Sequence, residues 1–380
     1  MESSLEAVNF GKSIIIPSVQ EMAKESMIKI PPRYERPDQD PPIISTDASP
    51  LLSSIPVIDL ERLAIEDSMD SELGILHSAC REWGFFQAVS STLLEEFKMQ
   101  VENFFKLPYE DKKKLWQKPD NHEGFGQLFV VSEEQKLDWS DMFYVTTLPL
   151  HLRMNDLFDK LPPNLREILE TYCTEVKKLA SEILGHMAKG LKMDAEEMKE
   201  LFSDGVQSIR MNYYPPCPEP DKAIGFSPHS DADALTILFQ LGETEGLEIR
   251  KEGRWIPVKP LPNAFVVNVG DITEIISNGV YRSVEHRAKV NSEKERLSVA
   301  TFYSSNLDSV LGPAPSLLGK HNPEIFRSVP IEKKPKGFYM QDYGEGCFQI
   351  FFDHEHDLLK MPLVFQELLA GAFALGDGVN

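Results

Sequence analysis

Two histidines and one aspartate in the second half of the chain have the residue types and the spacing of a metal site. His229 and Asp231 are separated by one residue, and His286 follows 57 positions after His229. Side chains alternate between the two faces of a β-strand, so His229 and Asp231 would point the same way on one strand. Two imidazoles and one carboxylate on one side of a metal leave the other side for exogenous ligands, as in non-haem Fe(II) oxygen chemistry. The three residues therefore predict an iron site.

Polar residues at the same alternate spacing occur in two neighbouring segments. Arg296 and Ser298 would share one face of a later strand with Ala300 and Phe302, and Asn212 and Tyr214 would form a same-face pair upstream. Together with the histidine and aspartate pair, they predict a site on which three strands converge.

The elements that must position these residues are short strands behind a long helix. After Gln207 the pattern predicts strands separated by turn residues at Ser208–Tyr214, Leu235–Gln240, Leu247–Arg250, Trp255–Val258, Ala264–Val269, Ser283–Val290 and Leu297–Tyr303. Apolar residues at helical spacing over Asn164–Leu191 predict an amphipathic scaffold helix laid along a sheet. Many short strands after a helical half favour a sandwich or barrel closed by helices.

The first part of the chain is predicted to be mixed in structure. Residues 1–54 resemble an extended arm with one short helix near Val19–Met27. A strand at Ile55–Leu60, a helix at Asp70–Trp83 and a strand from Gly84 follow. A further apolar stripe, best explained as core packing, consists of Leu94, Phe97, Val101 and Phe104.

Composition excludes several classes of protein. The chain has 380 residues and a net charge of −21, which argues against nucleic-acid partners and acidic membrane surfaces. No apolar run reaches a secretory or transmembrane length. Its four cysteines are widely spaced, which fits a reducing compartment and no structural zinc. We expect a cytoplasmic monomer that acts on a small molecule.

The motifs as a set resemble those of the plant 2-oxoglutarate/Fe(II)-dependent dioxygenases. The likeness rests on His-x-Asp, the distant His286 and Arg-x-Ser ten residues later. It also rests on the segments Asn-Tyr-Tyr-Pro-Pro-Cys-Pro and Asn-Val-Gly-Asp. It runs from about Ile55 to Pro315 and is strongest toward the senescence-related branch, beside enzymes that oxidise flavonoids and O-demethylate alkaloids.

This resemblance implies a mainly β fold with flanking helices and a double-stranded β-helix, or jelly-roll, core. The implied regions are the N-terminal arm at 1–54, a helical and strand region at 55–165, the scaffold helix and a linker at 166–204, the catalytic jelly roll at 205–305 and an atypical C-terminal segment at 306–380.

The resemblance also implies roles for the polar residues. Fe(II) would be held by His229, Asp231 and His286, with 2-oxoglutarate as co-substrate, O2 as oxidant and ascorbate as a candidate reductant. The distal carboxylate of 2-oxoglutarate would pair with Arg296, whose planar fork suits a carboxylate, helped by Ser298, Tyr214 and Asn212. By family position, the substrate pocket would include Phe302, Tyr144, Phe143 and Met142, although core packing explains each of them equally well.

Two departures leave a second hypothesis open. The family's Asn-His-Gly segment is absent after Gln87, and the stretch from Gly337 to Asn380 lacks the family's usual ending. The leading function is oxidation of a small specialised metabolite, such as a flavonoid or an alkaloid, by hydroxylation, desaturation or O-demethylation. The alternative is a catalytically impaired relative that binds a metal or metabolite as a regulator. A lectin or a zinc hydrolase is disfavoured, because neither needs Arg-x-Ser.

Overall fold

The computed structural model describes residues 14–25, 27–36, 55–89, 94–118, 121–127, 130, 133–326, 328–330, 338–342 and 348–352. Its helices are α1 (Val19–Lys24), α2 (Leu60–Ala64), α3 (Glu66–Glu82), α4 (Leu94–Phe105), α5 (Tyr109–Lys113), α6 (Asn155–Phe158), α7 (Pro163–Leu191), α8 (Ala195–Phe202) and α9 (Asp271–Ile276). Within these described ranges, no helix is long and apolar enough to cross a membrane.

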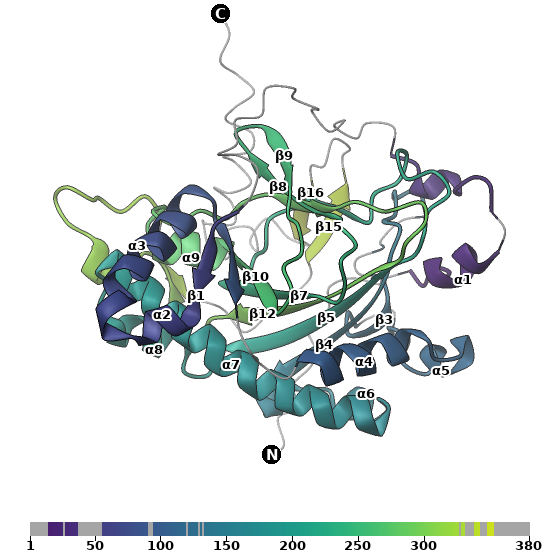
Figure 1. Cartoon of the computed structure of the whole chain (residues 1–380), viewed down its shortest axis with the longest axis horizontal. Helices are drawn as coiled ribbons and strands as arrows, with labels where there is room; N and C mark the ends of the chain where they lie inside the picture. Colours follow the sequence, from purple (N-terminus) through teal and green to yellow (C-terminus); the bar gives the residue numbers. More distant parts are fainter. Residues whose placement is uncertain are drawn as a thin grey trace, which may run out of the picture.

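Eight strands form one large sheet in the order β1-β2-β10-β7-β12-β5-β4-β3. Only β1 and β2 are paired in parallel; the other neighbours in this sheet are antiparallel. The strands are β1 (Val57–Asp59), β2 (Phe85–Val89), β3 (Gly124–Gly126), β4 (Asp141–Leu148), β5 (Val206–Tyr214), β7 (Leu235–Gln240), β10 (Ala264–Val269) and β12 (Arg296–Ser304). Regions on both sides of α7 in the sequence therefore share this sheet (Figure 1).

A smaller antiparallel sheet, ordered β6-β11-β8-β9, packs against the large one. Its strands are β6 (Phe226–His229), β8 (Leu247–Lys251), β9 (Arg254–Pro257) and β11 (His286–Ala288). An apolar cluster that includes Phe85 on β2, Ile249 on β8 and Val266 on β10 joins the two sheets. Two sheets packed in this way are the jelly-roll core that the sequence predicts. Four further strands form two separate ribbons: β13 (Val310–Leu311) with β14 (Val329–Pro330), and β15 (Phe338–Asp342) with β16 (Phe348–Phe352).

The two faces of the large sheet have different partners. On one face, alternate residues of β5 and β12 join the main apolar core with α3, α4 and α7, and α4 and α7 lie below the sheet in Figure 1. The residues between them point to the other face, toward the small sheet. On β12, for example, Val299 and Tyr303 are buried in the helical core, whereas Ser298 and Phe302 line the cavity between the sheets. The period of two thus separates residues that stabilise the fold from residues available for chemistry.

The predicted elements are largely confirmed, with one clear correction. The segments β7 and β10 have the predicted bounds, and the predicted scaffold helix is α7. The strand predicted over Ser283–Val290 is much shorter, because only His286–Ala288 forms β11 and its pairing with β6 shifts between His286 and Ala288. The strand β2 forms despite the missing Asn-His-Gly segment and pairs with both β1 and β10. Most of the stretch from Gly337 to Asn380 lies outside the described residues.

The N-terminal arm is attached through α1. The buried carboxylate of Asp141 on β4 accepts hydrogen bonds from Ser18 Oγ at 2.5 Å and from the backbone N–H groups of Val19 and Gln20, each at 2.9 Å. A carboxylate at the start of a helix satisfies N–H groups that have no partner within the helix. The arm is therefore held to the large sheet by one buried acid.

Candidate active site

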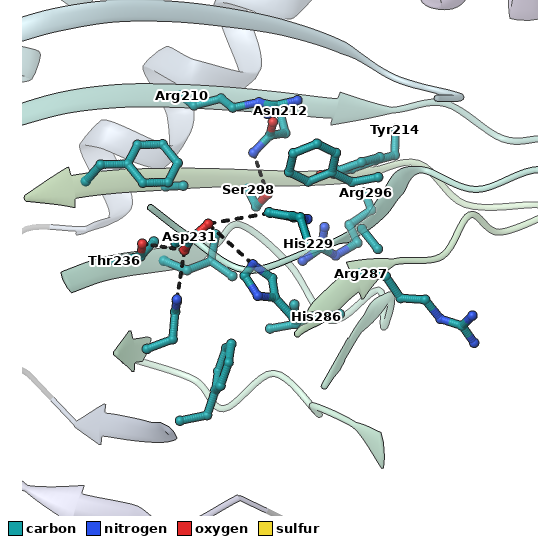
Figure 2. A pocket seen from close by; sticks show the side chains of 18 residues that line it. Arg210, Asn212, Tyr214, His229, Asp231, Thr236, His286, Arg287, Arg296 and Ser298 are labelled. Atoms are coloured by element: carbon teal, nitrogen blue, oxygen red, sulfur yellow. Dashed lines mark hydrogen bonds and ion pairs between the residues drawn. The ribbon is translucent and has the colours of Figure 1, made fainter. Parts of the chain in front are cut away.

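Three side chains that can ligate a metal meet between the two sheets. His229 at the end of β6 lies directly opposite His286 at the start of β11. Their Nε2 atoms lie 3.5 and 3.6 Å from Oδ1 of Asp231. The possible ligand atoms of the three residues all lie within 4.8 Å of one another (Figure 2). The convergence predicted from the sequence is thus present.

The reason for this convergence differs from the prediction in one respect. The strand β6 ends at His229, so Asp231 is not on the same strand but in the turn that follows. The backbone N–H of Asp271 at the start of α9 donates to the carbonyl of Asp231 at 2.8 Å, which fixes this turn. The turn and its contact with α9, rather than strand alternation, therefore aim the carboxylate.

Backbone carbonyls orient both imidazoles. Nδ1 of His229 lies 2.8 Å from the carbonyl oxygen of Ser227, and Nδ1 of His286 lies 3.1 Å from that of Val284. A carbonyl only accepts, so each Nδ1 carries the proton and each Nε2 lone pair is left for a metal. Burial, together with the neighbouring imidazole, lowers the pKa of His286 to about 4 and so keeps this ligand neutral at physiological pH.

The Asp231 carboxylate is held by two residues to which the sequence analysis gave no role. Its Oδ2 accepts hydrogen bonds from Thr236 Oγ1 at 2.5 Å and from Asn268 Nδ2 at 2.7 Å. Oδ1 is left facing the two imidazoles. Burial alone would raise the pKa of this carboxyl, but the imidazoles and the Thr236 hydroxyl outweigh burial and hold the pKa well below its usual range. In the sequence, Thr236 and Asn268 could have been identified as polar residues inside two otherwise apolar strands, Leu-Thr-Ile-Leu and Val-Val-Asn-Val.

This donor set fits Fe(II). Two neutral imidazole nitrogens and one carboxylate oxygen match the ligands that non-haem iron takes in proteins, and they approach from one side of the cavity. Each ligand is oriented through its non-ligating atom, because each histidine Nδ1 donates a hydrogen bond and Asp231 Oδ2 accepts two, as is usual around protein-bound metals.

A cluster of polar groups with unused hydrogen-bonding capacity lines the cavity beside the three ligands. Arg296 is 5% exposed, and its Nη2 donates to Oε1 of Gln240 at 2.9 Å while its Nε has no partner. Asn212 Nδ2 donates to Ser298 Oγ at 3.3 Å, and Asn212 Oδ1 has no partner. Within the described ranges, no carboxylate pairs with Arg296. Buried donors without partners fit an exogenous carboxylate such as the distal group of 2-oxoglutarate.

Arg296 is a residue of the cavity and not of the surface. Its guanidinium lies 5.1 Å from the centre of the Tyr214 ring, inside the cavity, and Glu295 instead accepts a hydrogen bond from the Tyr213 hydroxyl at 2.6 Å. On β5 and β12, Tyr214 lies opposite Arg296 and Asn212 opposite Ser298. The predicted face of paired polar residues is therefore present.

The candidate substrate residues fall into three groups. Phe302 lines the cavity. Met142 and Tyr144 on β4 lie opposite Asn212 and Arg210 and so share the cavity's face of the sheet, although neither lines the cavity itself. Phe143 points to the other face, where its ring lies 5.3 Å from that of Phe104. The assignment of Phe143 to the pocket is therefore corrected, because strand alternation places it in the helical core.

Two of the lining residues that the sequence analysis missed contact each other. Arg210 precedes Asn212 by two positions on β5, and its guanidinium lies 4.0 Å from the ring centre of Phe226 on β6. Both line the cavity. The alternate spacing of Arg210, Asn212 and Tyr214 was the signal that could have identified Arg210.

Comparison with known protein families gives two matches. Residues 205–305 match the 2OG-Fe(II) oxygenase superfamily, and residues 55–164 match the N-terminal region described as "non-haem dioxygenase in morphine synthesis". The three residues that could hold a metal ion lie within the first match.

Full-length relatives and a solved structure agree with these matches. Protein SRG1 of Arabidopsis thaliana is 50% identical, covering 90% of this chain and 94% of its own length. Oxoglutarate-dependent flavonoid 7-O-demethylase 1 of Ocimum basilicum is 46% identical, covering 89% of this chain and 91% of its own length. Thebaine 6-O-demethylase of Papaver somniferum is 49% identical, covering 84% of this chain and 91% of its own length. The crystal structure of JOX2 in complex with 2OG, Fe and JA superposes with a TM-score of 0.75 at 35% identity, covering 84% of this chain and 93% of that one.

Proposed function

Because the chain belongs to the 2OG-Fe(II) oxygenase superfamily, we propose that His229, Asp231 and His286 bind its Fe(II) and that Arg296 and Ser298 bind the distal carboxylate of its 2-oxoglutarate. The protein is a dioxygenase that uses Fe(II), 2-oxoglutarate and O2. The observation that carries the residue roles is the meeting of two oriented imidazoles and one oriented carboxylate in one cavity with a buried guanidinium whose Nε has no hydrogen-bond partner.

When bound, the iron supplies the oxidation, in which 2-oxoglutarate becomes succinate and CO2 and a C–H bond of the substrate is oxidised. The chain's own residues bind and orient. Arg296 offers two parallel N–H donors to a carboxylate, and Asn212 holds the Ser298 hydroxyl beside it. Phe302 and the apolar walls exclude water from the cavity, which strengthens every charge interaction inside it.

The substrate we propose is a small specialised metabolite with an aromatic ring system. Two relatives are named for O-demethylation of a flavonoid and of thebaine, and the cavity of this chain is lined by Phe85, Phe226 and Phe302. The names of these relatives favour O-demethylation as the reaction. In O-demethylation, oxidation of a methoxy C–H bond releases formaldehyde. A panel of methoxylated flavonoids and alkaloids, assayed for formaldehyde and demethylated product, tests this assignment.

We also propose a cytoplasmic, monomeric protein. Cys80, Cys173 and Cys217 are free and buried, which suits a reducing compartment. The impaired-relative hypothesis has no support, since all five proposed metal and co-substrate residues are in position.

Replacing one ligand tests the metal assignment. His286→Ala should abolish iron binding and 2-oxoglutarate-dependent succinate formation while leaving the circular dichroism spectrum unchanged, because a ligand is removed from an intact sheet. His151→Ala, at an exposed position outside the site, is the matched control and should behave as wild type. Wild-type iron content and succinate formation in His286→Ala would show that the metal site is elsewhere.

A further inference from the structure

A second buried arginine lies in the cavity, away from the proposed co-substrate arginine. On β5, Arg210 is opposite Ala300, whereas Tyr214, four residues later, is opposite Arg296. Four residues of strand span about 13 Å. Figure 2 shows Arg210 beside Asn212 in the upper part of the view and Arg296 lower, near Tyr214. Of the three arginines that line the cavity, Arg287 pairs with Glu248 and Arg296 is used by the proposed co-substrate, which leaves Arg210.

The guanidinium of Arg210 has no polar partner. The residue is 9% exposed, and its Nε is buried without a hydrogen bond. Across the described part of the chain it forms no hydrogen bond or ion pair, and its guanidinium lies over the face of the Phe226 ring. Native proteins rarely leave a buried charged donor unsatisfied. Burial lowers the pKa of Arg210, which expresses the cost of keeping this charge without a partner.

The acidic groups nearest to Arg210 are already engaged. Asp231 is held by Thr236 and Asn268 and faces the imidazoles. Asp138 pairs with Arg36 at 3.0 Å and accepts from the Ser227 hydroxyl at 2.6 Å. Neither is within ion-pair distance of Arg210. No described residue therefore supplies the partner that Arg210 lacks.

The charges in the cavity indicate the sign of that partner. The two charges of Fe(II) and the one of Arg296 are balanced by Asp231 and the two carboxylates of 2-oxoglutarate. Arg210 then adds one uncompensated positive charge. Arg210 lies near the reacting centre, because the Phe226 ring contacts both Arg210 and His229. The centre of the Phe226 ring is 4.0 Å from Cζ of Arg210 and 4.0 Å from the centre of the His229 ring.

We propose that Arg210 binds an anionic oxygen group of the organic substrate, a carboxylate or an acidic phenol, and so sets the orientation of the substrate at the iron. This specificity role rests on the proposed function of the same cavity. It disfavours substrates that would place a protonated amine against Arg210, because like charges buried together repel strongly.

A matched pair of probes tests the proposal. The probes are 4-methoxycinnamate and its methyl ester, which share one skeleton and differ by one negative charge. Binding is measured by calorimetry, without O2, on protein carrying Fe(II) and 2-oxoglutarate, so that no turnover occurs. Wild type should bind the carboxylate at least about tenfold more tightly than the ester, the effect expected of a charge-assisted hydrogen bond. Arg210→Gln should abolish this preference and Arg210→Lys should retain part of it, whereas Arg166→Gln, on the exposed side of α7, should retain all of it.

Several results would overturn the assignment. These are equal binding of the two probes to wild type, a preference that survives in Arg210→Gln, and a tenfold loss of 2-oxoglutarate affinity in that variant, which would place Arg210 in the co-substrate site. A melting temperature lowered by several degrees in Arg210→Gln would instead show a structural role, since removing an unpaired buried charge should not destabilise the fold. Failure of the proposed function is recognised separately, because wild type would then bind neither Fe(II) nor 2-oxoglutarate in the same anaerobic calorimetry.

Discussion

Asn268 on β10 donates a hydrogen bond of 2.7 Å from Nδ2 to Oδ2 of Asp231, in the turn after β6. The large sheet thereby fixes the carboxylate that completes the metal-binding set on the small sheet. The relationship explains why one oxygen of Asp231 faces both imidazoles while the other faces away. It also ties the geometry of the site to the packing of the two sheets.

Asn268→Ala should weaken iron binding without removing a ligand. Without the amide, Asp231 loses one of the two hydrogen bonds that orient it, and losses of roughly 10- to 100-fold in metal affinity are usual for such partners. The measurement is Fe(II) affinity by anaerobic titration. Asn155→Ala, at an exposed position at the start of α6, is the control and should match wild type. An unchanged iron affinity in Asn268→Ala would show that Thr236 alone orients the carboxylate.

Arg296→Lys should impair co-substrate binding more than iron binding. Lysine keeps the charge but loses the two-point fork, so the apparent constant for 2-oxoglutarate should rise by more than about tenfold, or about 1.4 kcal/mol. The measurement is succinate formation against 2-oxoglutarate concentration, with iron affinity followed in parallel. Arg166→Lys is the control. If the 2-oxoglutarate dependence does not change, Arg296 is not the carboxylate partner.

Asp141→Ala should release the N-terminal arm. The substitution leaves the Ser18 hydroxyl and the N–H groups of Val19 and Gln20 without their shared acceptor. Each buried donor left unsatisfied costs on the order of 1–3 kcal/mol, so the arm should detach rather than stay buried. Limited proteolysis should then cut before residue 36 much faster than in wild type. Asp159→Ala, an exposed acid after α6, should leave the digestion pattern unchanged, and equal cleavage rates in all three proteins would refute this role of Asp141.

His122 should make the fold less stable as the pH falls. Burial lowers its pKa to about 4, below the value near 6.5 that the unfolded chain would have. As the pH falls, the unfolded state therefore binds the proton first. The stability that neutral His122 contributes to the fold is fully present above about pH 6.5 and is lost as the pH falls toward 4. His122→Asn should reduce the loss of unfolding free energy between pH 7 and pH 5 by roughly 1–3 kcal/mol.

The measurement for His122 is chemical denaturation of the metal-free protein at each pH. His151→Asn, at an exposed position, should keep the wild-type slope. A wild-type slope in His122→Asn as well would assign the pH dependence to other groups, such as His286.

The sequence by itself identified the residues that we propose for binding the metal and the co-substrate. Patterns such as His-x-Asp and Arg-x-Ser are local, and strand alternation translates them directly into a shared face, as it does for Arg296 and Ser298 on β12. The strands β7 and β10 and the helix α7 were predictable for the same reason, because apolar periodicity is a property of neighbouring residues.

Only the tertiary structure decided how those residues are held and which others join them. The contact between Asn268 and Asp231 joins positions 37 apart, and Arg210 proves unusual only when its whole surroundings are known. The tertiary structure also ended β6 at His229, shortened β11 and turned Phe143 into the helical core. Each of these outcomes depends on packing between segments distant in the chain, which a local pattern does not encode.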